Sequence, residues 1–283
     1  MKKKILIPTD FSKNAWNAMT YALNLFKGES CEFHVLNVFY LGGYSTENLL
    51  IPEPGDAAYE SIKESSENRM NKLKTQLDYR EDSPDHRFYF YSEFGPLTEV
   101  IKLMIEKKDI EFIVMGTRGE TDSKDVIFGS SATEVMENIR LCPVLAVPGT
   151  SLFKEPNEIV FPTSFKTHFK RRELKHLVEI AKLTKAPVRI LHIKKEDKLT
   201  EEQEENKALL EDILAAIEFS HHTLENIDVK KGLHSFVQSR ESEMIAFINK
   251  KHTFFGSIFS KPLVKELGAH SKVPILAMHD IRA

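Results

Sequence analysis

The sequence predicts an α/β protein made of two tandem domains, each with a parallel sheet flanked by helices. Short β-type runs alternate with segments of helical periodicity, as expected for crossover connections in a parallel sheet. The pattern then begins again, since residues 159–165 resemble 5–11 and residues 273–278 resemble 142–147. Matched ends with the same order of elements between them indicate a duplication. We therefore expect domains at 1–150 and 157–283.

The composition of the 283 residues is that of a folded protein, with 41% hydrophobic and 29% charged residues. A net charge of −3 gives no bulk attraction to polyanions, so neither nucleic acid nor a membrane is expected as a partner. The apolar run after the N-terminal lysines is too short for a signal peptide or a membrane span. Both cysteines, Cys31 and Cys142, lie in or beside apolar runs, which suits a reducing compartment. The cytoplasm is the expected location.

The first half, residues 1–150, predicts five strands and four helices. Strands are expected at 5–7, 33–39, 87–91, 112–115 and 143–147. Helices are expected at about 13–27, 59–79, 96–105 and 130–139, where apolar residues recur at three and four positions. The segment Leu41–Ala58 is rich in Gly, Pro, Ser and Asn, and is either a lid over a ligand or a surface excursion.

The second half, residues 157–283, is expected to follow the same order. Strands are expected at 159–161, 188–193, 224–229, 244–248 and 273–278. Helices are expected at about 168–183 and 201–219.

The stretch most informative about function is Gly116-Thr117-Arg118-Gly119, followed by Gly129-Ser130-Ser131. It joins a buried strand to a helix. The first N–H groups of a helix have no intrahelical partner, the macrodipole is positive there, and glycine lets a ligand approach closely. Asp10 follows the first strand, so it is expected at the same edge of the sheet. The pattern predicts a nucleotide site.

Structural explanations of the same residues stay open. The glycines and serines are also typical of a tight turn followed by a helix cap. Asp10 is a candidate cap for the helix that begins near Lys13. Arg118 and Lys124 are candidates for phosphate contacts, with a solvated surface position as the alternative.

The second half keeps the scaffold signals and lacks these residues. Ser164 stands in place of Asp10, and no glycine follows Ile248 closely. By counting back from Pro274, the position of Gly129 falls on Ser260. We expect a scaffold or sensor domain there, with the run 250–252 as a weaker candidate for an anion. Because the fold repeats without the glycines, we expect them to serve a ligand rather than the fold.

On these residues the chain resembles the universal stress protein family in its tandem form. The motifs are Ile-Pro-Thr-Asp at 7–10, Gly-x2-Gly-x9-Gly-Ser beginning at Gly116, and Pro-Val-Leu-Ala-Val at 143–147. The resemblance implies two Rossmann-like domains of the adenine nucleotide alpha hydrolase-like type, each a five-stranded parallel sheet of order 3-2-1-4-5. It also implies that the two domains pair through their fifth strands, 144–147 with 275–278.

The resemblance further implies an ATP site in the first half, with or without Mg²⁺. Asp10 would hydrogen-bond the ribose or adenosine end, and Val38 would offer backbone groups to adenine. Met115 and the first two glycines would line the phosphate path, and the start of the helix would hold the phosphates. The expected binding residues are Thr9, Asp10, Val38, Met115, Gly116, Arg118, Gly119, Gly129, Ser130 and Ser131.

Three functions remain open at this point. The first is a stress-response protein that binds ATP as a regulatory ligand; the second is a weak ATP-hydrolysing or nucleotidyl-transferring enzyme; the third is a ligand-free pseudo-dimeric scaffold. The chain lacks the P-loop, nucleophile-elbow and zinc-helix motifs, and its histidines lack metal-ligand spacing. No catalytic residue and no metal ligand is therefore predicted. A homodimer of whole chains is left open.

Overall fold

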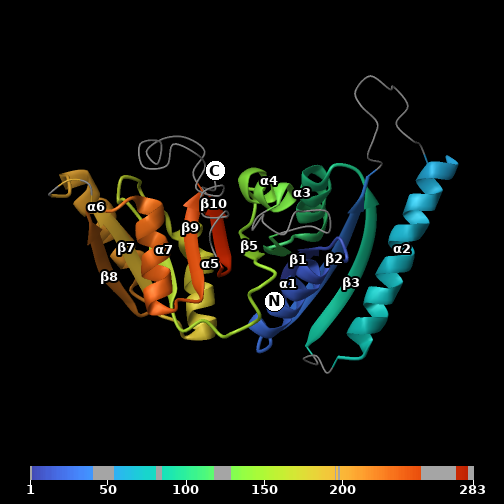
Figure 1. Ribbon diagram of the computed structural model, residues 1–283, viewed down its shortest axis with the longest axis horizontal. Coiled ribbons are helices and arrows are strands. Elements are labelled where there is room, and N and C mark those ends of the chain that lie inside the picture. The colour runs from blue at the N-terminus through green and yellow to red at the C-terminus, as the bar shows by residue number, and fades with distance from the viewer. Residues whose placement is uncertain are drawn as a thin grey trace, which may run out of the picture.

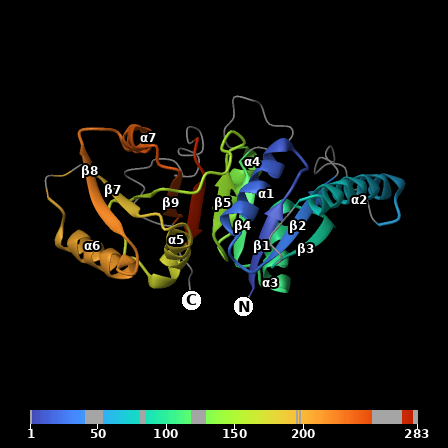
Figure 2. The same ribbon diagram turned by 90° about the horizontal axis from the view of Figure 1, so that it is seen from below.

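A computed structural model describes residues 2–40, 54–80, 85–117, 129–194, 196, 198–249 and 272–279. One ten-stranded sheet runs through both halves in the order β3-β2-β1-β4-β5-β10-β9-β6-β7-β8, and Figure 1 shows the halves side by side. Helices cover both faces of the sheet, as the view from below in Figure 2 also shows. Among the described residues, no helix has both the length and the apolar character needed to cross a bilayer.

The first half contains the nine elements that its sequence predicts. They are β1 (Lys3–Pro8), α1 (Lys13–Leu25), β2 (Cys31–Phe39), α2 (Ala57–Asp78), β3 (His86–Phe94), α3 (Leu97–Lys108), β4 (Phe112–Gly116), α4 (Ser130–Asn138) and β5 (Val144–Val147). Its strands pair in parallel in the order 3-2-1-4-5, which confirms the predicted fold class. Most of the predicted lid segment, Leu41–Ala58, lies outside the described residues.

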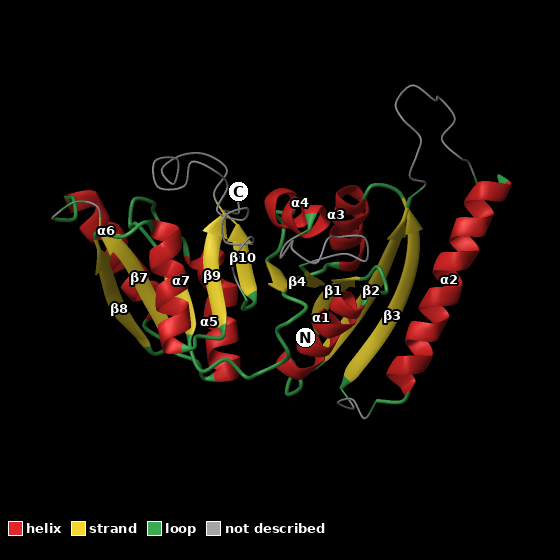
Figure 3. Cartoon of the chain, in the orientation of Figure 1, coloured by secondary structure: helices red, strands yellow, loops and turns green. Residues whose placement is uncertain are grey.

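The second half has the same order of strands, with three errors in the predicted elements. Its elements are β6 (Ile159–Pro162), α5 (Arg171–Thr184), β7 (Val188–Lys194), α6 (Glu201–Leu214), β8 (Phe219–Glu225), α7 (Val229–Arg240), β9 (Met244–Asn249) and β10 (Ile275–His279), coloured by type in Figure 3.

The errors concern the region around β8. The helix predicted to reach Phe219 ends at Leu214, the strand predicted at 224–229 begins at Phe219, and α7 was not predicted. β8 is an edge strand with polar residues on it, so its alternation carries little hydrophobic signal. Asp228 was the available signal for α7, because its carboxylate accepts from the N–H of Lys230 at 3.0 Å as a helix cap.

The two halves meet where β5 pairs antiparallel with β10, with Leu145 opposite Leu276. Two hydrophobic cores lie on the two faces of the sheet, and each includes residues from both halves. One core lies under α1, α2, α5 and α6, and the other under α3, α4 and α7. On the first face, Glu179 of α5 also reaches Lys3 of β1 at 3.3 Å. The halves therefore share continuous cores.

The strand registers show which residues of the two halves correspond. Ile5 pairs with Phe112, as Ile159 pairs with Met244. Counting along β4 and β9 from these pairs, Gly116 corresponds to Ile248 and Thr117 to Asn249. The turn after the first strand is also repeated. Phe11 and Phe165 both have positive φ, 64° and 56°, and each N–H donates to the preceding threonine hydroxyl at 3.0 Å.

Candidate functional site

A cavity of about 480 Å³ opens at the carboxyl ends of β1, β2 and β4. It lies where the strand order switches direction between β1 and β4, the usual place for ligands in open parallel sheets. Its volume is in the range of small-molecule sites. The lining residues are Pro8, Thr9, Asp10, Ala15, Leu36, Val38, Tyr40, Gly95, Pro96, Leu97, Met115, Gly116, Ser131, Ala132 and Glu134.

Most of the predicted site residues lie at this cavity. Six line it: Thr9, Asp10, Val38, Met115, Gly116 and Ser131. Gly129 and Ser130 stand beside it at the start of α4 without lining it. Arg118, Gly119 and Lys124 lie outside the described residues.

The turn that carries Asp10 is fixed by hydrogen bonds to its backbone. Asn37 donates to the Thr9 carbonyl at 2.6 Å, and Arg69 of α2 donates to the Asp10 carbonyl at 3.0 Å. The Asp10 carboxylate accepts from the N–H of Ser12 at 3.0 Å. The prediction that Asp10 caps α1 is wrong, because the cap is Ser12, whose hydroxyl accepts from the N–H of Ala15 at 3.1 Å.

A buried polar network behind this turn was not predicted. The Ser66 hydroxyl of α2 donates to the side-chain amide oxygen Oδ1 of Asn37 at 2.7 Å and lies 2.9 Å from the Ser92 hydroxyl of β3. The network joins α2 to the ends of β2 and β3. Each residue taken alone carries no sequence signal, because its partner depends on how the long α2 crosses the sheet.

Gly116 lines the cavity, and close packing against α1 also favours a glycine at this position. A Cβ built on it would lie 3.1 Å from the backbone carbonyl carbon and oxygen of Asn14, at the start of α1. The second half accepts Ile248 at the corresponding position because α5 begins at Arg171, six residues after Phe165, whereas α1 begins only two residues after Phe11. The expectation that the glycine serves only a ligand is therefore wrong for Gly116.

The N-terminus of α4 is suited to an anion. Its N-cap is Gly129, which has no side chain with which to cap the helix and whose own N–H donates to the Thr117 carbonyl at 2.6 Å. The first-turn N–H groups that follow have no intrahelical acceptor, and the helix dipole makes this end positive. Ser130 and Ser131 are exposed there. Three consecutive amides and two hydroxyls are thus gathered at one rim of the cavity.

Several lining residues were not among the predicted ones. Tyr40, Pro96 and Leu97 add apolar wall, and Glu134 adds a second carboxylate beside Asp10. Glu134 accepts from the Thr98 hydroxyl at 3.2 Å. A signal for part of this wall was present, because Gly95-Pro96 ends the third parallel strand and must therefore lie at the same edge of the sheet as Asp10.

The described residues leave little space at the corresponding place in the second half. Only about 20 Å³ remains beside Ser164 and His192, room for about one water molecule. Ile193, the counterpart of Val38 by register, packs against α7, where a Cβ added to Gly232 would lie 2.9 Å from its Cδ1 atom. The described residues around Ser164 therefore leave no space for a nucleotide.

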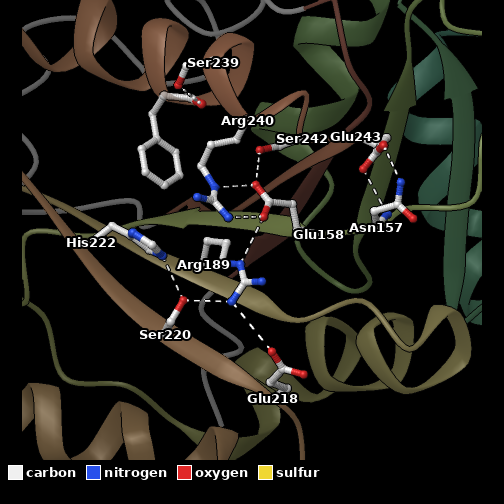
Figure 4. A network of polar contacts seen from close by, with 11 residues as sticks. Asn157, Glu158, Arg189, Glu218, Ser220, His222, Ser239, Arg240, Ser242 and Glu243 are labelled. Atoms are coloured by element: carbon white, nitrogen blue, oxygen red, sulfur yellow. Dashed lines mark hydrogen bonds and ion pairs between the residues drawn. The ribbon is translucent and has the colours of Figure 1, made fainter.

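A second polar cluster, shown in Figure 4, lies at the opposite, amino ends of the strands of the second half. Glu158 accepts from Arg240 at 2.9 and 2.7 Å, from Arg189 at 3.0 Å and from Ser242. Burial alone would raise the pKa of Glu158, but these hydrogen bonds hold it at about 2. The cluster ties α7 and β7 to the start of β6. The described part of the chain has no group of three His, Cys, Asp or Glu side chains arranged to hold a metal ion.

The sheet order and the cavity at its switch point define a Rossmann-like α/β protein with a candidate small-ligand site. The model of the universal stress protein family matches residues 1–148. Universal stress protein MJ0531 of Methanocaldococcus jannaschii is 30% identical over 154 residues, which cover 51% of this chain and 81% of that protein. Universal stress protein MJ0577 of the same organism is 29% identical over 160 residues, which cover 52% and 95%. The chain belongs to the universal stress protein family.

Solved structures extend the likeness of fold to both halves. A universal stress protein from Archaeoglobus fulgidus superposes with a TM-score of 0.68 at 16% identity, covering 97% of each chain. The functionally unknown protein PA1789 from Pseudomonas aeruginosa gives a TM-score of 0.60 at 13% identity, covering 98% of this chain and 92% of its own. The tandem arrangement therefore has counterparts among known folds.

Proposed function

We propose that this universal stress protein binds ATP in the first-half cavity as a regulatory ligand. The observation that carries the proposal is the contrast between the halves. A cavity of about 480 Å³ lies between Asp10 and the start of α4, while about 20 Å³ remains at the matching place beside Ser164. Among the described residues, the fold thus leaves space for a ligand of this size at the first of the two corresponding places.

The chemistry of the lining fits a nucleotide whose base lies against the apolar wall and whose phosphates lie at the start of α4. Leu36, Val38 and Leu97 form an apolar wall suited to a flat base. Asp10 offers carboxylate oxygens to ribose hydroxyls, and the amides at the start of α4 suit phosphate oxygens. The lining includes the carboxylates Asp10 and Glu134, so a triphosphate is expected to enter as its Mg²⁺ complex, with the metal held mainly by the phosphates.

The proposal concerns binding of ATP and includes no hydrolysis step. The described lining residues include no histidine, lysine or cysteine, which leaves the carboxylates Asp10 and Glu134 as the candidate general bases among them. We propose further that the antiparallel β5–β10 junction takes the place of a subunit interface between two such domains. We also propose that the protein works in the cytoplasm.

The proposal is tested by placing a negative charge where the phosphates would lie. Ser131→Glu adds a carboxylate at the first turn of α4. The helix dipole stabilises a negative charge there, so the free energy of unfolding should stay within about 0.5 kcal/mol of the wild-type value. Ser65→Glu adds the same charge on an exposed position of α2. Calorimetry should show ATP binding to the wild type and to Ser65→Glu, and a loss of at least tenfold in Ser131→Glu. No binding by the wild type, or equal binding by both variants, would contradict the proposal.

A further inference from the structure

The second half reaches the candidate phosphate site through the last turn of α4. β9 ends at Asn249, whose side-chain amide donates to the Met136 carbonyl at 3.1 Å. In return, the Arg140 guanidinium donates to the Asn249 carbonyl at 3.2 Å. Met136 lies in the last turn of α4, where carbonyl groups lose their intrahelical donors. Asn249 therefore serves as a cap that comes from the other half of the molecule.

α4 depends on contacts of this kind for its position. The helix has nine residues, a length at which isolated helices are marginal in water, and Gly129 gives it no side-chain cap at the other end. Its buried residues Ala132, Val135 and Met136 pack on the core beneath it. Packing sets the height of the helix above the sheet, while the two hydrogen bonds at Asn249 hinder sliding along its axis.

The strand registers show which residue of the first half corresponds to Asn249. Asn249 corresponds to Thr117, the residue that follows Gly116 in the glycine motif of the first half. In the first half this position belongs to the glycine motif from which the sequence predicts the nucleotide site. The second half, whose described residues leave only about 20 Å³ beside Ser164, uses the same position to hold α4 of the first half.

We infer that Asn249 is a positioning residue for the phosphate end of the nucleotide site. It acts through α4, by fixing the axial position at which the amides of Ser130, Ser131 and Ala132 meet a ligand. The inference rests on the proposed function. It gives the second half a role in binding that needs no ligand of its own.

The experiment compares ATP with adenosine, because only ATP carries the phosphates proposed to meet the start of α4. In Asn249→Ala, we expect affinity for ATP to fall about fivefold or more while affinity for adenosine stays within twofold. Amide exchange of residues 130–138 should become faster, which is measurable without ligand. Asn249→Gln, which keeps an amide donor, should recover part of the affinity for ATP.

The matched control is Asn206→Ala. Asn206 is buried, and its amide donates to the Phe165 carbonyl at 2.9 Å within the second half, away from α4. This variant should bind ATP as the wild type does. Three results would overturn this inference and leave the proposed function standing. They are equal loss of ATP affinity in both variants, a parallel loss of adenosine affinity in Asn249→Ala, and unchanged ATP binding by Asn249→Ala. Absence of ATP binding to the wild type would overturn the proposed function and this inference with it.

Discussion

Gly116 and Asn14 are in contact so close that no other residue fits at position 116 without movement. A Cβ on Gly116 would lie 3.1 Å from the carbonyl carbon and oxygen of Asn14, and 3.3 Å from the Ala15 nitrogen. The neighbours are backbone atoms of α1 rather than the end of a flexible side chain. The contact places the start of α1 directly over the end of β4, and both elements line the cavity.

The first prediction is that Gly116→Ala destabilises the fold by about 1–3 kcal/mol through overpacking, with or without nucleotide. Gly28→Ala is the matched control, because nothing lies within 4 Å of a Cβ there, and it should lose no stability. Urea denaturation of both variants checks this. A Gly116→Ala variant as stable as the wild type would show that α1 is not held by this contact.

The second prediction concerns Asp10 and its counterpart Ser164. Asp10→Ala should lower ATP affinity about tenfold or more, since a hydrogen bond to a charged group contributes about 1.5–3 kcal/mol. Ser164→Ala makes the equivalent change in the filled half and should leave ATP affinity unchanged. Calorimetric titration of both variants decides the point, and equal effects would place the ligand elsewhere.

The third prediction concerns the Glu158 cluster. The Glu158 side chain is 9% exposed and binds two guanidinium groups, so Glu158→Ala leaves Arg189 and Arg240 without their shared acceptor. We expect a loss of about 3 kcal/mol in the free energy of unfolding. Glu225→Ala, which breaks the exposed pair with Lys194, should cost less than about 1 kcal/mol. Similar losses in the two variants would show that the cluster contributes no more than a surface ion pair.

The fourth prediction is a loss of stability in acid. Burial tends to raise the pKa of Glu179, but hydrogen bonding to His176 and the charge of Lys3 bring it to about 2, the value also reached by Glu158. Unfolded glutamates titrate at about 4.3, so between about pH 4.5 and 2 the unfolded chain binds more protons. Stability should therefore be full above about pH 5 and fall as the pH drops to 2.

Thermal melts from pH 6 to pH 2.5 check this dependence. The double variant Glu158→Gln and Glu179→Gln should start less stable at pH 6 and lose stability less steeply in acid. An unchanged slope would mean that other carboxylates control acid unfolding.

The sequence was sufficient to place the core of the site. Thr9, Asp10 and Gly116 follow the ends of two parallel strands, and such ends share one edge of a sheet, so their meeting at one cavity was predictable. The strand order of both halves was predictable from the duplication and the family resemblance. The place of these residues depends on local pattern and chain order, whereas the exact strand order depends on the family resemblance.

The rest depends on distant partners. Three features join segments far apart in the chain, and no local sequence periodicity predicts them. They are the Asn37–Ser66 hydrogen bond, the place of Tyr40 in the cavity wall and the Asn249–Met136 cap. β8 was misplaced because an edge strand with polar residues has little hydrophobic alternation. The packing role of Gly116 was hidden because it depends on how soon α1 begins after the turn at Phe11.

Titration of the full chain with Mg²⁺–ATP in a calorimeter tests the central claim most directly. The contrast between the open cavity at Asp10 and the small space that the described residues leave beside Ser164 predicts saturable binding of one ATP per chain. Ser131→Glu should weaken that binding at least tenfold. Absence of saturable binding, or two ATP molecules per chain, would contradict the account.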